Sequence, residues 1–157
     1  RFSFALAKLG YSVVGIEPAA APRKIAQAEA KKRKARSVRF YPYALEDMRF
    51  ANKSFDVVLC IELFHHLPDE TVQFALNRFH DLLKPGGLLV FDAKNSDNPL
   101  LAWQYRRDRR PDRPLIARPL AWFVRQAEEA GFKVLDKKGV LLPAVLSPWS
   151  VIVAEKI

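Results

Sequence analysis

The sequence predicts an α/β fold built on one open, mostly parallel sheet, and three observations lead to this prediction. Short apolar runs rich in β-branched residues alternate with helical stretches along most of the 157 residues. The run Phe55–Ile61 is apolar throughout except for Asp56, which is typical of a strand covered on both faces. The last two strand candidates are joined by a proline-containing loop with no helix, so we expect them to be antiparallel neighbours.

The elements follow in chain order from the apolar pattern and its breaks. The expected strands are Val13–Ile16, Val38–Tyr41, Phe55–Ile61, Leu88–Phe91, Phe132–Asp136 and Ser150–Glu155. The expected helices are Phe2–Leu9, Arg23–Arg36, Asp69–Leu83 and Leu120–Ala130. Pro22 marks the start of the second helix, and the segment 84–87 (Lys-Pro-Gly-Gly) ends the third. A polar, arginine-rich insertion at 94–119 interrupts the alternation, and we expect a single domain over 1–157.

The excess of positive charge is local. The formal net charge is +9, and most of it comes from residues 31–36 and 106–113. A protein that coats duplex nucleic acid usually spreads its basic residues over a broad face, so nucleic acid is an unexpected partner. For residues 106–113, two interpretations stay open: a mobile lid that selects an acceptor, with an anionic one suited to arginine, or an ordinary solvated basic loop.

The cysteine count and the apolar runs suggest a location. Cys60 is the one cysteine, so an internal disulfide is excluded and a reducing compartment is favoured. No apolar run approaches the roughly 20 residues that cross a bilayer. We therefore expect a soluble, cytoplasmic protein in which Cys60 is a small buried hydrophobic side chain.

Glu17 directly follows the strand candidate Val13–Ile16. In open α/β sheets a ligand binds beyond the carboxyl ends of the strands, where an acid can accept hydrogen bonds from both hydroxyls of a ribose. An ordinary solvated loop carboxylate would look the same in the sequence, and the residue alone leaves both interpretations open.

Five short segments form a pattern by their order and spacing: 14–17 (VGIE), 46–60 (EDMRF leading into SFDVVLC), 66–69 (HLPD), 82–87 (LLKPGG) and 130–132 (AGF). Together they resemble the class I S-adenosylmethionine-dependent methyltransferases. The stretch 60–69 most resembles the branch with the ubiquinone-biosynthesis O-methyltransferases. The resemblance implies a Rossmann-like sheet with helices on both faces and an antiparallel last strand. It also implies methyl transfer from S-adenosyl-L-methionine to a small-molecule acceptor.

The resemblance also implies roles for single positions. Glu17 would bind the two ribose hydroxyls of the cofactor. Leu45 would lie against the adenine with its backbone N–H offered to the ring, and Ile61 would close the other side. Ala44 occupies the position where the family usually has an acid that accepts from the adenine amino group, so either Glu46 replaces that acid or the affinity for the cofactor is lower.

His66 matches the family histidine at the mouth of the active site. Methyl transfer from a sulfonium is an in-line displacement, so the protein contributes mainly by alignment, and a general base helps when the acceptor is a hydroxyl. Histidine titrates nearest neutrality, which makes His66 the candidate base. A role in capping or packing the loop before Pro68 is the structural alternative.

Two further patterns are weaker. Glu62, His65 and His66 have i, i+3, i+4 spacing that could ligate a divalent ion on a helical turn, but Pro68 limits any helix here, so we expect no metal. Three aromatic residues flank the arginines of the insertion and could form either an acceptor wall or packing contacts. They are Trp103, Tyr105 and Trp122.

Two other functions remain open. A nicotinamide-dependent oxidoreductase also uses an acid at a sheet edge, but the helix-free link between the last two strands disfavours it. A non-catalytic basic interaction domain with a decayed cofactor site would account for Ala44 and for the basic clusters.

The family's first strand and glycine-rich loop have no counterpart in the sequence, because Arg1 already lies in the helix that should follow them. We therefore expect a β-branched strand, an acid and a Gly-x-Gly-type turn to be encoded just upstream of Arg1. Without them, the 157 residues should bind the cofactor poorly and be only marginally stable.

Overall fold

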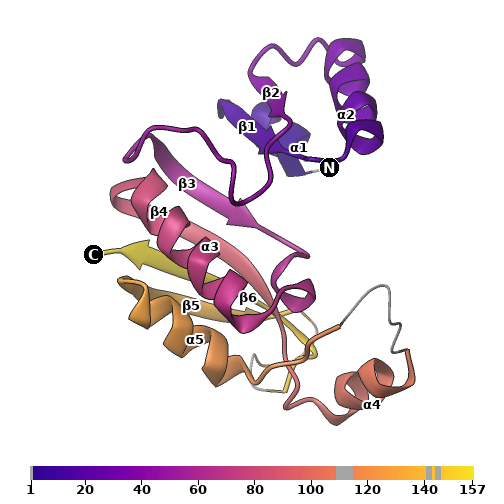
Figure 1. Cartoon of the computed structure of the whole chain (residues 1–157), viewed down its shortest axis with the longest axis vertical. Coiled ribbons are helices and arrows are strands. Elements are labelled where there is room, and N and C mark those ends of the chain that lie inside the picture. Colours follow the sequence, from indigo (N-terminus) through magenta and orange to yellow (C-terminus); the bar gives the residue numbers. More distant parts are fainter. Residues whose placement is uncertain (1, 109–114, 141–142, 144–145) are drawn as a thin grey trace. The chain divides into compact units, whose positions relative to one another are not determined.

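The computed structural model describes residues 2–108, 115–140, 143 and 146–157. By its contacts the chain divides into two compact units, residues 1–49 and 50–157. Each unit has its own strands and helices (Figure 1) and is described by itself.

The first unit contains a pair of parallel strands and two helices. Its elements are α1 (Phe2–Lys8), β1 (Val13–Ile16), α2 (Ala20–Lys32) and β2 (Val38–Tyr41). Both strands have the predicted bounds, and they pair in register from Val13 opposite Val38 to Ile16 opposite Tyr41. The second helix begins three residues before its predicted start, with Pro22 in its first turn, where no backbone donor is needed. It ends early because Lys34 adopts a left-handed conformation with φ of 53°.

Close packing of aromatic rings holds this unit together. A Cβ atom on Gly15 would lie 2.6 Å from a ring carbon of Phe40, so a side chain at that position would displace the ring. Phe40 in turn meets Phe4 of α1 edge to face, and the Arg33 guanidinium lies 4.9 Å from the Phe4 ring centre.

The second unit is a four-stranded mixed sheet with order β3-β4-β6-β5. Its elements are β3 (Phe55–Cys60), the 3-10 helix η1 (Phe64–His66), α3 (Asp69–Leu82), β4 (Leu83–Lys94), α4 (Pro99–Arg107), α5 (Leu120–Glu129), β5 (Phe132–Gly139) and β6 (Trp149–Lys156). Strands β3 and β4 are parallel, whereas β6 runs antiparallel to both β4 and β5. The antiparallel ending predicted from the helix-free link is confirmed.

In the second unit, two elements differ most from the prediction, while the other bounds shift by one to three residues. Strand β4 begins at Leu83 instead of Leu88, because the Lys-Pro-Gly-Gly segment stays alongside β3 through a register shift. The insertion contains the unpredicted helix α4, whose start is fixed by Asn98, since its Oδ1 accepts from the Leu101 N–H at 2.9 Å and Pro99 follows.

The core of the second unit lies between the sheet and two helices. Helices α3 and α5 contact each other and cover the same face of the sheet (Figure 1). Phe91 of β4 is fully buried, with Phe64 at 5.4 Å and Phe123 at 6.5 Å between ring centres. These rings are part of the buried apolar core that stabilises the sheet.

Arg118 fastens the segment after β3 from the side of the insertion. Its buried guanidinium donates to Asp69 Oδ1 at 2.6 and 2.8 Å, to the Phe64 carbonyl at 3.0 Å and to the Leu67 carbonyl at 2.6 Å. The Ile116 N–H also donates to the His65 carbonyl at 2.9 Å. The return of the insertion therefore holds η1 in place.

Replacing Arg118 by Met should destabilise the protein by about 2 to 4 kcal/mol, because the two carbonyls lose a charged donor while Asp69 is exposed enough to be solvated again. Arg125→Met is the matched control, since Arg125 is exposed and lies 3.9 Å from Glu129; it should change stability by less than about 0.5 kcal/mol. Urea unfolding measures both variants. A loss below about 1 kcal/mol in Arg118→Met would contradict the fastening role.

Candidate active site

Glu17 lies at the carboxyl end of β1, as predicted. Its backbone N–H donates to the Tyr41 carbonyl at 3.0 Å, which extends the parallel pairing by one residue. Its side-chain Oε1 accepts from the Ala19 N–H at 2.9 Å, and Arg23 donates to the Glu17 and Pro18 carbonyls at 2.8 Å. These contacts fix the turn into α2 and hold the carboxylate at the end of the strand.

Ala44 and Leu45 follow the neighbouring strand β2. Both are half-buried and lie in a turn in which the Asp47 N–H donates to the Ala44 carbonyl at 3.3 Å. Because β1 and β2 are parallel, the turn and Glu17 follow the same edge of the strand pair. The structure thus brings three of the predicted cofactor residues together within the first unit.

Ile61 and His66 belong to the second unit, in the segment that follows β3. Ile61 is half-buried, and the next residue, Glu62, adopts a left-handed conformation with φ of 61°. The Glu62 N–H donates to Asp92 Oδ1 at 2.7 Å, so a buried carboxylate on β4 holds this turn. Burial raises the pKa of Asp92, against the opposing effects of the Glu62 N–H and of Lys94.

The two histidines of η1 differ in exposure. His65 is buried, with its Nε2 3.6 Å from Glu62 Oε2, whereas His66 is half-buried. Their rings lie 4.0 Å apart. His66 therefore retains partial access to solvent, whereas His65 does not.

The possible metal ligands differ from those suggested by the helical spacing. Within the described part of the chain, one group of His, Cys, Asp and Glu side chains places its ligand atoms within 4.8 Å of one another, and it comprises Glu62, His65 and Asp92. His66 is not in it, because η1 is a three-residue 3-10 turn that begins only at Phe64.

Sequence reasoning missed Asp92 and Lys94. Lys94 Nζ lies 2.6 Å from Glu62 Oε1, 3.7 Å from Asp92 Oδ2 and 3.7 Å from the centre of the Trp149 ring. The sequence did hold a signal for them. Asp92 directly follows the apolar run Leu88–Phe91, and Lys94 comes two residues later, where the carboxyl end of a parallel strand is expected.

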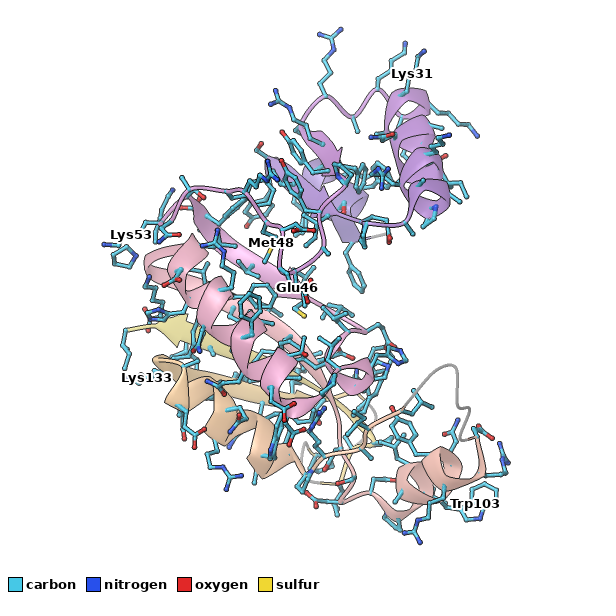
Figure 2. The ribbon with its side chains drawn as sticks, in the orientation of Figure 1. Lys31, Glu46, Met48, Lys53, Trp103 and Lys133 are labelled. Carbon is cyan, nitrogen blue, oxygen red and sulfur yellow. The ribbon has the colours of Figure 1, made fainter. Side chains whose placement is uncertain are left out.

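The insertion contributes aromatic residues with different surroundings. Tyr105 of α4 is half-buried, and burial together with Glu62 and Asp92 raises the pKa of its hydroxyl. Trp103 is 59% exposed and points outward from α4 (Figure 2), with Arg107 over its ring. Trp122 stacks on Arg118. Of the three aromatic residues considered for an acceptor wall, Tyr105 is the one whose hydroxyl is influenced by the carboxylates of Glu62 and Asp92.

Three other sequence-level expectations have partial answers. Cys60 is buried, and desolvation raises the pKa of its thiol, which suits a structural role. Arg33 of the first basic cluster pairs with Glu29, while Lys31 extends from α2 (Figure 2). Of the predicted lid, Arg106 and Arg107 lie in α4, and residues 109–113 fall outside the described residues.

Known proteins share both the sequence pattern and the fold. A family model described as "Methyltransferase domain" matches residues 1–91. The ubiquinone biosynthesis O-methyltransferase of Colwellia psychrerythraea is 31% identical over 148 residues, covering 88% of this chain and 58% of that protein. The chain thus spans less than two thirds of the length of this relative.

Two solved structures have the same fold. A SAM-dependent methyltransferase from Methanosarcina mazei superposes with a TM-score of 0.80 at 20% identity, covering 99% of this chain and 86% of that one. The PH0226 protein from Pyrococcus horikoshii gives a TM-score of 0.83 at 20% identity, covering 99% and 76%. The family match over 1–91 and the shared fold show that this chain belongs to the class I S-adenosylmethionine-dependent methyltransferases.

Proposed function

We propose that the protein transfers a methyl group from S-adenosyl-L-methionine to a small-molecule acceptor. The observation that carries the proposal is the placement of Glu17 at the carboxyl end of β1, beside the turn at 44–45 that follows β2. In a member of this family, that is where a carboxylate can receive the cofactor ribose.

The residues present fit the cofactor, with one substitution. Within the first unit, Glu17 offers a carboxylate for the ribose diol and Leu45 offers apolar surface for the adenine. The adenine contact of Ile61, which belongs to the second unit, stays a prediction from the family resemblance. Ala44 has no side-chain acceptor, so we propose that the exposed Glu46 two residues later takes the adenine amino group. The bound cofactor would supply the methyl group on its sulfonium.

We further propose that the acceptor binds on the side of the insertion 94–119, within a single methyltransferase domain over 1–157. His66 would take the proton of an acceptor hydroxyl, and Arg118 and Asp92 would hold the loop that carries it. A hydroxyl acceptor agrees with the name of the Colwellia relative, an O-methyltransferase.

An anionic acceptor remains a prediction from the arginines, and a cytoplasmic location remains a prediction from the single cysteine. No helix in the described residues is long and apolar enough to span a membrane.

The competing functions predict different ligands. A nicotinamide-dependent oxidoreductase would bind NAD through Glu17, but β6 lies antiparallel between β4 and β5, as in the ending that the family resemblance implies. For a basic interaction domain, the contacts of Arg33 with Glu29 and Phe4 give part of the first cluster a structural role instead.

Glu17→Ala should weaken binding of S-adenosylhomocysteine to the full-length protein by about 2 to 4 kcal/mol, because each hydrogen bond to a charged group contributes about 1.5 to 3. Isothermal titration calorimetry measures the loss. Glu29→Ala on α2 is the matched control and should leave affinity unchanged. An affinity of Glu17→Ala within about threefold of wild type would remove Glu17 from the cofactor site.

His66→Asn should lower kcat by about 10²-fold or more while leaving the affinity for S-adenosylhomocysteine unchanged, since a general base acts on the acceptor proton and not on the cofactor. The assay is methyl transfer to a panel of phenolic and other hydroxyl acceptors. His80→Asn, on α3 beside Phe132, is the matched control and should retain activity. Full activity in His66→Asn would leave His66 with the loop-packing role.

A further inference from the structure

The carboxyl ends of β3 and β4 carry three ionisable side chains, none of which contacts the cofactor or the acceptor in the proposed methyl transfer. Glu62, His65 and Asp92 present ligand atoms that all lie within 4.8 Å of one another. Two carboxylates and an imidazole are a donor set that divalent transition-metal ions accept. The cluster therefore has the chemistry of a cation site.

Asp92 gives an independent sign that a cation belongs here. Its side chain is 1% exposed, and its Oδ2 atom accepts no hydrogen bond of good geometry among the described residues, although the neighbouring Trp149 side chain also favours the charged carboxylate. A carboxylate taken out of water is strongly unfavourable unless an opposite charge lies close to it. Since Oδ1 is occupied by the Glu62 N–H, Oδ2 is the atom that needs the charge.

We propose that the ammonium group of Lys94 is the resident cation of this cluster, held between its two carboxylates, so that the chain supplies its own cation there. Lys94 Nζ lies 2.6 Å from Glu62 Oε1 and 3.7 Å from Asp92 Oδ2. The Trp149 ring closes another side at 3.7 Å, and the Lys94 side chain is 13% exposed. A divalent ion would find both carboxylates already paired with Lys94, and the ammonium charge would repel it.

The sheet register explains why the ammonium is held at this point. Asp92 and Lys94 are two residues apart on β4, so their side chains leave the same face of the strand. Trp149 is the cross-strand partner of Lys94 in the antiparallel pair with β6. The cation–π contact is therefore a direct consequence of the pairing.

A surface ion pair in the same unit shows the contrast. Lys84 Nζ lies 2.7 Å from Asp56 Oδ1, but these side chains are 47% and 80% exposed. Such a pair contributes little and leaves no buried charge when it is broken. Lys84 is thus a matched control for Lys94 on the same strand.

The test is thermal unfolding of the full chain in EDTA and in about 1 mM MnCl₂ or ZnCl₂, since an ion that binds the folded state raises the unfolding midpoint. The wild-type midpoint should stay within about 1 °C in both salts. Lys94→Met should gain at least about 3 °C from one of the ions, because the vacated site then accepts a metal. Lys94→Met combined with Asp92→Asn should lose this gain, and Lys84→Met should never show it.

Three results would overturn the proposal. The first is a metal-induced rise in wild type that Asp92→Asn abolishes, since a metal would then be the resident cation. The second is a Lys94→Met variant that folds without gaining stability from either ion. The third applies if Lys94→Met is unfolded in EDTA. Lys94→Gln is then tested beside it, and the circular-dichroism spectrum after addition of metal is measured in place of the unfolding midpoint. The proposal is overturned if neither variant regains the folded spectrum.

Discussion

The hydrogen bond from the Glu62 N–H to Asp92 Oδ1 holds the turn that follows β3 against the neighbouring strand β4. The candidate site residues of the second unit lie in or next to this turn. The hydrogen bond joins the carboxyl ends of the parallel strands β3 and β4 across 30 positions of sequence. It also stabilises a left-handed glutamate, a conformation that costs about 1 to 2 kcal/mol in a residue with a side chain. Ile61, the histidines of η1 and the ion pair with Lys94 all take their positions from this turn.

The same loop is held from its other side by the insertion. Arg118 binds the Phe64 and Leu67 carbonyls, and the Ile116 N–H binds the His65 carbonyl. The sheet thus fixes the start of the segment 61–67 through Asp92, and the insertion fixes its end. The candidate base His66 lies in this segment and needs such support, because a small displacement of a catalytic group lowers the reaction rate strongly.

The sequence predicted the strands better than the site. Strands β1 and β2 were predicted to the residue because apolar β-branched runs between breakers have few alternatives, whereas helix α4 was missed inside a polar insertion. The spacing of Glu62, His65 and His66 would place them on one face only of a helical turn, which Pro68 disfavoured, and the structure has a three-residue 3-10 turn there. Lys94 was missed because its role depends on the register that places Trp149 opposite it, which no local pattern encodes.

We propose that the ends of β1 and β2 receive the adenosyl cofactor of a methyltransferase. The decisive measurement is titration of the full-length protein with S-adenosylhomocysteine and, separately, with NAD. We expect saturable binding of S-adenosylhomocysteine at micromolar concentration and no measurable heat with NAD. Binding of NAD in preference to S-adenosylhomocysteine would contradict it, and binding of neither ligand would favour a basic interaction domain.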